Sequence, residues 1–275
     1  MKAGIVGLGL IGGSLGLDLQ DRRIVEKVVG IDHNLAHCEE ALSLGLVNDI
    51  VTMDEIKKCD LIFLSIPVNA IVELLPSLKD VSQDNTIIDL GSTKKRIVDA
   101  TPKEITKNFV AAHPMAGTEK FGPTAAFKGL FDNHTVVLCD TERNDEFHKN
   151  RAIDIFKKLN MKIYYMNAKE HDKHASFISH LPHAISYSLA NAVMSQEDPR
   201  SILAMAAGGF KDMSRVAKSS PKMWSDVFKQ NKENLLSSID IFEKELQKVK
   251  ELMEHENWEA LEIWMQKATT LHKIL

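Results

Sequence analysis

The stretch Lys2–Leu17, KAGIVGLGLIGGSLGL, decides the fold of the first half of the chain. A short apolar run is followed at once by a G-x-G-x-x-G pattern at residues 7–12. Where such a pattern joins a strand to a helix, its glycines permit a tight turn, close approach of a pyrophosphate and close packing of helix on strand. The helix start then presents free N–H groups to the phosphates. The residues expected to contact a dinucleotide here are Gly7, Gly9, Leu10, Ile11 and Gly12.

An acidic residue at the end of the second apolar run strengthens this interpretation. Asp32 lies twenty residues after Gly12, where a carboxylate accepts hydrogen bonds from the ribose hydroxyls of a bound dinucleotide. A carboxylate there repels the 2′-phosphate of NADP, and His33 and Asn34 offer no arginine to receive it, so NAD is favoured. The other role open to Asp32 is to cap the following helix, and the two roles can coexist.

Short apolar runs alternate with helix-like stretches through the first half. The apolar runs are nearly continuous, as expected for parallel strands buried on both faces. The expected strands are Ala3–Val6, Val28–Asp32, Leu61–Ile66, Thr86–Leu90, Val110–His113, Val136–Cys139 and Lys162–Met166, and the expected helices include Leu35–Leu44, Val68–Leu78 and Asp145–Leu159. The alternation predicts an α/β Rossmann-type domain with a parallel sheet covered by helices on both sides.

The strand signal disappears after about Asn167, so we expect an all-α C-terminal domain. The predicted division is 1–166 for NAD binding and 167–275 for substrate binding and dimerisation. Helix breaks are expected near residues 198–199, 208–209 and 219–221. Apolar residues at 235, 239, 242, 246, 249 and 253, and again at 261, 264, 268, 271 and 275, stay on one helix face. They predict either a helix-to-helix core or a homodimer seam, and the length of the two helices favours the seam.

Composition excludes several classes of function. The net charge is −4 without a basic stripe, so a nucleic-acid partner is not expected. Three cysteines without a C-x-x-C spacing suit a reducing compartment and indicate neither a disulfide framework nor a zinc site. The apolar stretch at residues 3–17 is too short to span a membrane and contains six glycines. We therefore expect a cytoplasmic protein with no membrane partner.

Several polar motifs follow the predicted strands, and the carboxyl ends of parallel strands are where ligands gather. We expect Ser65 and Pro67, after one strand, to line the cofactor site. His113 ends another strand and is the best candidate for an acid–base group, because the unperturbed pKa of histidine lies near neutrality. Taken alone, a histidine at a strand end is more often a helix or turn residue hydrogen-bonded to the backbone, and the neighbouring motifs are what favour the acid–base role of His113.

These motifs together resemble the prephenate dehydrogenase family. The segments are GLGLIGGS at 7–14, DLGSTK at 89–94, HPMAGTEKFG at 113–122, HD at 171–172, SHLPH at 179–183 and GGFKDMSRVA at 208–217. The resemblance runs from Met1 to roughly Asn234. It implies NAD-dependent oxidative decarboxylation of prephenate to 4-hydroxyphenylpyruvate in tyrosine biosynthesis, or of its amino analogue arogenate to tyrosine.

The resemblance also implies roles for particular residues. His113 would accept the hydroxyl proton of the substrate, and Ser92 would orient that histidine or the hydroxyl. Arg215 would hold a substrate carboxylate, which suits its bidentate donors. Without the resemblance, Arg215 would be read as the surface partner of Asp212, one helical turn back. The remaining residues expected in the substrate site are His183, Thr118 and Glu119.

Four histidines at 171, 174, 180 and 183 have helical spacing that could suggest a metal site. No carboxylate stands in register as in H-E-x-x-H, so we expect no metal, and we expect His180 to be a hydrogen-bonded core residue. Met205, Met213, Met223 and Trp224 are expected in the core. The alternative functions are another two-domain dehydrogenase, such as a β-hydroxyacid dehydrogenase or a pyrroline carboxylate reductase, and a dinucleotide-binding sensor without turnover.

Overall fold

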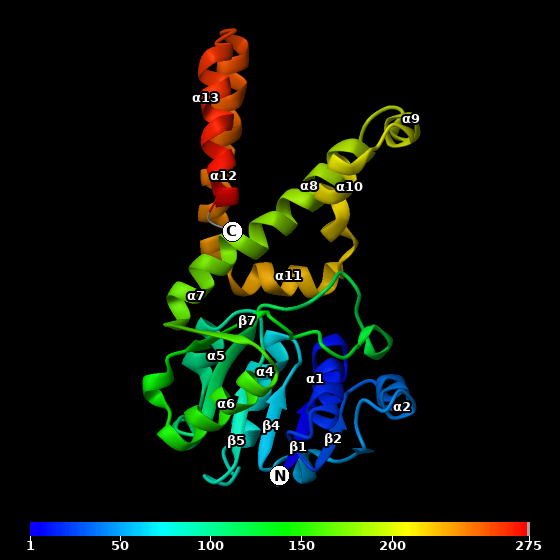
Figure 1. Ribbon diagram of the computed structural model, residues 1–275, viewed down its shortest axis with the longest axis vertical. Helices are drawn as coiled ribbons and strands as arrows, with labels where there is room; N and C mark the ends of the chain where they lie inside the picture. The colour runs from blue at the N-terminus through cyan, green and yellow to red at the C-terminus, as the bar shows by residue number, and fades with distance from the viewer. Residues whose placement is uncertain (274–275) are drawn as a thin grey trace.

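The computed structural model describes residues 1–273, and its first half is built on one eight-stranded sheet (Figure 1). The strand order is β3-β2-β1-β4-β5-β6-β7-β8. The strands are β1 Lys2–Val6, β2 Lys27–Ile31, β3 Asp49–Ile50, β4 Leu61–Leu64, β5 Thr86–Asp89, β6 Phe109–Pro114, β7 Thr135–Cys139 and β8 Lys162–Met166. All seven expected strands are present, and β3 was too short to be found from apolar periodicity.

The sheet is mostly parallel, as expected, and one pair of strands departs from that expectation. Strand β7 runs antiparallel to β6, with His113 opposite Val137. The segment between these strands contains only the short 3₁₀ helix η3, Pro123–Ala125, and no α-helix. A parallel return needs a crossover connection, usually helical, so the chain comes back in the opposite direction.

Helices cover both faces of the sheet, and alternate strand residues enter two separate cores. On one face Ile5 packs with α1 Leu10–Asp21, α2 Leu35–Ser43 and α6 Glu146–Lys158. On the other face, Val6 packs with α3 Met53–Ile56, α4 Val68–Leu74 and its 3₁₀ extension η1 Leu75–Leu78, and α5 Lys95–Ala100. Short 3₁₀ turns at Lys103–Ile105 (η2) and Thr141–Arg143 (η4) complete this half. Burial on both faces explains the continuous apolar runs of the strands.

The second half is helical, and every expected break is confirmed. It contains α7 Ala168–Ala175, the π-helical turn η5 Ser176–His180, α8 Leu181–Met194, α9 Pro199–Ala204, α10 Gly208–Ser214, the 3₁₀ turn η6 Arg215–Lys218, α11 Pro221–Gln230, α12 Lys232–Glu254, α13 Trp258–Thr269 and η7 Thr270–Lys273. Leu275, the last residue of the expected apolar series, lies outside the described residues. Within residues 1–273, none of the helices has the length and apolarity needed to cross a membrane.

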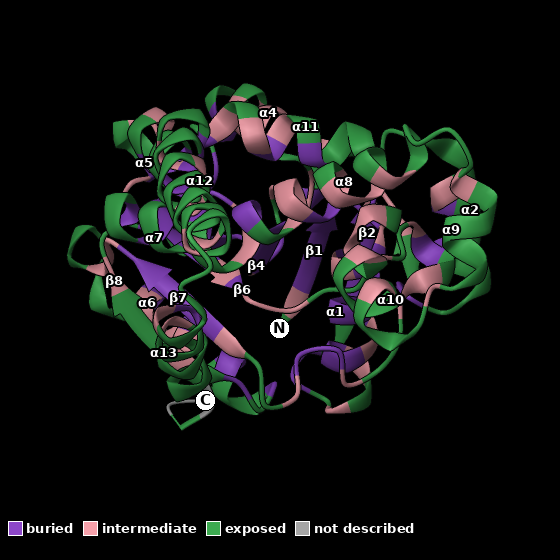
Figure 2. Cartoon of the chain, turned by 90° about the horizontal axis from the view of Figure 1, so that it is seen from above, coloured by how far each residue is buried: buried purple, intermediate pink, exposed green. Residues whose placement is uncertain are grey.

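Two helical arms rise from the sheet domain, one formed by α8, α9 and α10 and the other by the antiparallel pair α12 and α13 (Figure 1). Strand β1 is buried along most of its length, whereas α12 is mostly exposed (Figure 2). The expectation that three methionines fill a core was wrong, because Met205, Met213 and Met223 are 79%, 58% and 41% exposed. The three cysteines, Cys38, Cys59 and Cys139, are buried free thiols.

Candidate active site

The glycine turn has the shape that a dinucleotide pyrophosphate requires. Gly7 has φ +94°, a left-handed conformation that favours glycine. A Cβ on Gly12 would lie 2.0 Å from the Gly7 carbonyl oxygen, so the helix could not approach the strand with any larger residue. A Cβ on Gly9 would meet nothing within 4 Å. The backbone of Gly9 therefore faces open space, and the Ser65 hydroxyl secures the turn by donating to the Gly7 carbonyl at 2.7 Å.

Asp32 is held beside this turn by backbone donors. One carboxylate oxygen accepts from the Leu8 N–H and the other from the Asn34 N–H, both at 2.9 Å. Its side chain is only 7% exposed, with the His33 ring at 3.1 Å. The alternative role of Asp32, as the cap of the next helix, is not found in the described residues: Asn34 caps α2 by accepting from the Ala36 N–H, and the Asp32 carboxylate turns back toward the glycine turn. These residues fit NAD, whose ribose hydroxyls donate to such a carboxylate.

His113 stands half-buried at the carboxyl end of β6 and belongs to a chain of polar contacts that crosses the domain boundary. Its Nδ1 lies 2.8 Å from Nε2 of His171, on α7. Nδ1 of His171 lies 2.8 Å from the Asp172 carboxylate. Burial, with smaller electrostatic contributions from His171, Lys94 and His180, holds the pKa of His113 well below its ordinary value. The ring is therefore neutral at physiological pH, as a proton acceptor must be.

A buried lysine supports the same strand end. Lys94 is fully buried, its ammonium contacts the Asp89 carboxylate, and it donates to the Ala112 carbonyl at 2.7 Å. Ser92 lies on the segment between Asp89 and Lys94. Among residues 1–273 no protein hydrogen bond joins Ser92 to His113, and the bonded partner of the ring is His171. The structure thus brings to His113 a residue to which the sequence analysis gave no catalytic role, although it lies in the HD motif at 171–172.

Arg215 is brought to the loop that follows His113. Its guanidinium forms an ion pair with Glu119 at 3.3 Å, so these two expected substrate-site residues lie together. The alternative pairing of Arg215 with Asp212 is not found among the described residues. Arg215 is still 57% exposed and retains donors for a ligand. Thr118 is exposed, and its hydroxyl accepts from the Lys120 N–H at 3.2 Å, within the same loop.

His183 stacks on Trp224, with ring centroids 3.4 Å apart and planes 21° from parallel. Its Nδ1 donates a hydrogen bond to the Ser179 carbonyl at 2.9 Å, so Nε2 is not the nitrogen engaged with Ser179. Burial lowers the pKa of His183, and the charge of Arg215 lowers it further, although the bond to Ser179 opposes both. Trp224 is 9% exposed, which confirms the expectation that it is a core residue. Its indole N–H is buried and has no hydrogen-bond partner within the described part of the chain.

His180 is a core residue, as expected. It is 1% exposed, and its Nδ1 lies 3.1 Å from the Asn231 amide nitrogen, which must donate the hydrogen bond. Burial lowers the pKa of His180 to about 4. Over residues 1–273, no cluster of three or more His, Cys, Asp or Glu side chains is placed to hold a metal ion.

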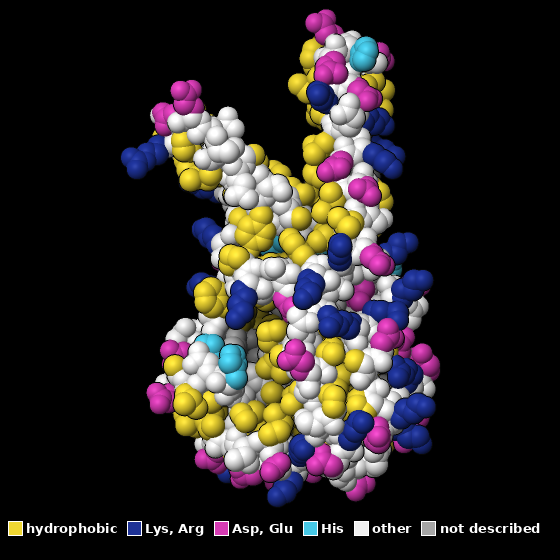
Figure 3. Space-filling model, turned by 180° about the vertical axis from the view of Figure 1, so that it is seen from behind, with side chains coloured by type: hydrophobic (Ala, Val, Ile, Leu, Met, Phe, Trp, Pro, Cys, Tyr) yellow, Lys and Arg dark blue, Asp and Glu magenta, His cyan; other side chains and the backbone are white. Residues whose placement is uncertain are grey.

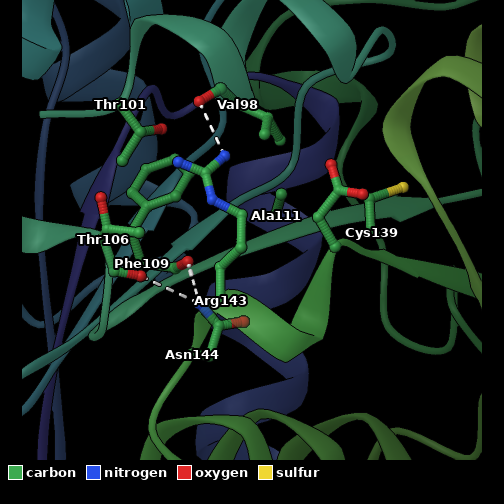
Figure 4. A pocket seen from close by; sticks show the side chains of 9 residues that line it. Val98, Thr101, Thr106, Phe109, Ala111, Cys139, Arg143 and Asn144 are labelled. Carbon is green, nitrogen blue, oxygen red and sulfur yellow. Dashed lines mark hydrogen bonds between the residues drawn. The ribbon is translucent and has the colours of Figure 1, made fainter. Parts of the chain in front are cut away.

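A small pocket lies elsewhere, between α5, β6 and β7 (Figure 4). Its walls are held by the Arg143 guanidinium, which donates to the Val98 carbonyl at 3.1 Å, and by the Asn144 amide, which donates to the Phe109 carbonyl at 2.7 Å. Its volume of about 10 Å³ leaves room for about one water molecule. This pocket is too small for a metabolite and is a structural feature.

Comparison with solved structures agrees with this arrangement. A crystal structure of prephenate dehydrogenase from Aquifex aeolicus, in complex with hydroxyphenyl propionate and NAD+, superposes with a TM-score of 0.92. The two chains are 31% identical, and the match covers 99% of this chain and 97% of that one. The arogenate dehydrogenase of Synechocystis superposes with a TM-score of 0.82 at 29% identity, over 99% of both chains.

Sequence comparison gives the same result. The prephenate dehydrogenase of Bacillus subtilis (strain 168) is 32% identical over 264 residues, which cover 94% of this chain and 71% of that protein. Residues 15–165 match the family described as prephenate dehydrogenase, nucleotide-binding domain. Residues 167–267 match the family described as prephenate dehydrogenase, dimerization domain. The chain therefore belongs to the prephenate dehydrogenase family.

Proposed function

We propose that this protein oxidises and decarboxylates prephenate to 4-hydroxyphenylpyruvate with NAD. The observation that carries the proposal is the neutral imidazole of His113, at the same sheet edge as the open turn around Gly9. Family membership and the similarity to an enzyme solved with hydroxyphenyl propionate and NAD+ support this substrate class. Buried free thiols suit the reducing cytoplasm, where we place the reaction.

In this proposal His113 takes the proton of the substrate hydroxyl as hydride leaves the carbon that bears it. The ring carboxylate departs as carbon dioxide, and its bonding electrons complete the aromatic ring. NAD, when bound, supplies the hydride acceptor. Arg215 binds a substrate carboxylate, Ser92 orients the hydroxyl or the histidine, and His183, Thr118 and Glu119 line the substrate site.

The proposed cofactor site takes in residues from the glycine turn and from the ends of β2 and β4. We assign it Gly7, Gly9, Leu10, Ile11, Gly12, Asp32, Ser65 and Pro67. Residues 1–166 would thus bind the cofactor, while 167–275 would bind substrate and form the dimer. Asp32 favours NAD, because both of its oxygens are fixed by backbone donors beside the turn and would repel a 2′-phosphate.

The test is NADH formation, followed by absorbance, with purified protein, NAD and either prephenate or arogenate. We expect turnover with prephenate. Turnover with arogenate alone would reassign the enzyme as an arogenate dehydrogenase, an activity present among its structural relatives. NAD binding without NADH formation from either compound would overturn the proposal and favour a sensor or another dehydrogenase.

We also propose a homodimer formed by the C-terminal helices. Apolar side chains are exposed along both arms, including Leu246 and Met253 of α12 at 54% and 51%. Yellow apolar patches occupy the hollow between the arms (Figure 3). Exposed apolar surface of this extent is typical of a protein–protein interface. The matched family of this half is described as a dimerization domain.

Sedimentation equilibrium tests the dimer. We expect a dimer for the unmodified protein and a shift toward monomer for Leu246→Glu, because a charge would be buried in the seam. The matched control is Leu42→Glu, which changes a leucine of α2 that is 43% exposed and should leave the dimer intact. A monomeric unmodified protein at micromolar concentration, or equal behaviour of the two variants, would overturn this assignment.

A further inference from the structure

Three side chains from the two halves of the molecule form a continuous hydrogen-bonded chain that ends at His113. The carboxylate of Asp172 contacts Nδ1 of His171 at 2.8 Å, and Nε2 of His171 contacts Nδ1 of His113 at the same distance. Asp172 and His171 are both buried, with 3% and 2% of their surfaces exposed. His113 is less buried than either. The chain thus runs from the interior to the place where we expect the substrate.

The carboxylate is fixed and stays ionised. It accepts hydrogen bonds from the backbone N–H groups of Lys94 and Lys95, at 2.7 and 2.9 Å, at the start of α5. Burial raises the pKa of Asp172, but the hydrogen bonds from His171, Lys94 and Lys95 outweigh it, and the pKa is lowered. An ionised carboxylate only accepts hydrogen bonds, so Nδ1 of His171 must carry a proton.

The protonation of His171 sets that of His113. A neutral imidazole has one N–H and one acceptor nitrogen. With its proton on Nδ1, neutral His171 offers Nε2 as an acceptor, and Nδ1 of His113 must then be the donor. The remaining nitrogen of His113, Nε2, is left with a lone pair and no proton.

We propose that His171 and Asp172 are positioning residues that hold His113 as the tautomer protonated on Nδ1, so that Nε2 faces the reaction as the proton acceptor. The second part of this statement rests on the proposed function; the tautomer does not. When the substrate hydroxyl gives its proton to Nε2, the Nδ1 proton stays on His113. The resulting imidazolium then donates to His171, and the charge of Asp172 stabilises it along the chain.

The decisive measurement is the tautomer of each histidine in the unmodified protein without substrate. Long-range ¹H–¹⁵N correlation spectra of histidine-labelled protein distinguish Nδ1–H, Nε2–H and imidazolium rings. Resonances are assigned by their loss in His113→Asn and in His171→Gln. We expect both rings to be neutral and protonated on Nδ1 at pH 7.5. An Nε2–H tautomer of His113, or an imidazolium at His171, would overturn the proposal.

The steady-state kinetics of variants test whether the hydrogen bond between His171 and His113 contributes to turnover. His171→Phe removes the acceptor, and we expect kcat with prephenate to fall roughly 100-fold, the lower range for loss of a positioned base, with little change in KM. His171→Gln can place an amide oxygen near the lost nitrogen and should retain clearly more kcat. His174→Gln, an exposed histidine of the same helix, is the control. Equal kcat values for His171→Phe and His171→Gln would contradict the positioning role.

The two proposals fail in different ways. If the spectra show the expected tautomers but no NADH forms with prephenate, the chain of hydrogen bonds stands and the substrate assignment fails. If prephenate turns over but His113 carries its proton on Nε2, the positioning role fails. The tautomers are read from the unmodified protein, and His113→Gln and His171→Phe provide second variants for the assignment, so one variant that does not fold leaves the test intact.

Discussion

The sheet edge beneath His113 buries polar groups, whereas the two helical arms expose apolar side chains. At the sheet edge, buried polar groups are paired with one another: Lys94 with Asp89, and Asp172 with two backbone N–H groups and His171. On the arms, apolar side chains such as Met205 and Ile263 are 79% and 60% exposed. The polar groups of the first region are paired within one chain, whereas the exposed apolar surface of the second is what we expect of the proposed dimer interface.

Of the substitutions that test this contrast, we expect His113→Asn to have the largest effect on activity. His113→Asn removes the base without disturbing the apolar layers of the sheet, so kcat with prephenate should fall by about 10²- to 10⁴-fold while thermal stability changes little. The measurement is steady-state NADH formation, with NAD binding as a control for the fold. Near-normal turnover at neutral pH would remove His113 from the mechanism.

We expect acid to lower the free energy of unfolding through His180, which is buried where the helical arms begin. The pKa of this buried ring is lowered to about 4 in the folded state, against 6.5 for an ordinary histidine. As the pH falls from about 6.5 to about 4, the unfolded chain takes up a proton there that the folded chain does not. The free energy of unfolding should fall by roughly 3 kcal/mol across this window.

Urea unfolding of the unmodified protein and His180→Gln at pH 7 and pH 5 checks this contribution. The variant should lose less stability between the two pH values, since glutamine does not titrate. His174→Gln, at an exposed position on α7, should behave like the unmodified protein. Identical losses for His180→Gln and the unmodified protein would mean that His180 does not carry the acid sensitivity.

Arg215 joins the two regions, and its removal should change substrate binding more than chemistry. In Arg215→Gln we expect KM for prephenate to rise roughly tenfold to a hundredfold, because a hydrogen bond to a charged group contributes about 1.5–3 kcal/mol. Lys218→Gln, in the same short helix, is the matched control. A fall in kcat at unchanged KM would instead place Arg215 in the transition state.

Two glycines of one turn should separate folding from cofactor binding, with the smallest effect at Gly9. Gly9→Ala meets no protein atom within 4 Å, so Tm should be unchanged while KM for NAD rises roughly tenfold, about 1.4 kcal/mol. Gly12→Ala forces a methyl group to 2.0 Å from the Gly7 carbonyl oxygen and should lower Tm. A lower Tm in Gly9→Ala would show that the space above Gly9 is needed by the fold.

The sequence was most informative where a residue pattern is compatible with only one type of local structure. Continuous apolar runs located the seven longer strands, and prolines or paired glycines located the helix breaks at Pro199, Gly208 and Pro221. The direction of β7 could not be read, because an apolar strand looks the same in either direction. The exposed methionines could not be read either, since helical periodicity does not distinguish a core from an interface between chains.

The candidate site was partly predictable for a related reason. Motifs at strand ends identified His113 and Asp32, because parallel strands deliver their ends to one edge. The contact of His113 with His171 joins residues 58 positions apart, on a strand and a helix of different halves, and no local pattern specifies it. Likewise the pairing of Arg215 with Glu119, rather than Asp212, depends on how the helical half lies on the sheet.

Asn231 lies between α11 and α12 and connects the start of α12 to the helix that carries His171, the partner of His113. Its amide donates to the backbone carbonyl of Asp172 at 2.6 Å and also contacts His180. The long helix that we assign to the subunit interface therefore begins one hydrogen bond away from α7, which carries His171. In the proposed dimer, Asn231 would link subunit association to proton acceptance, and we expect a change in how two chains meet to alter the geometry of the base.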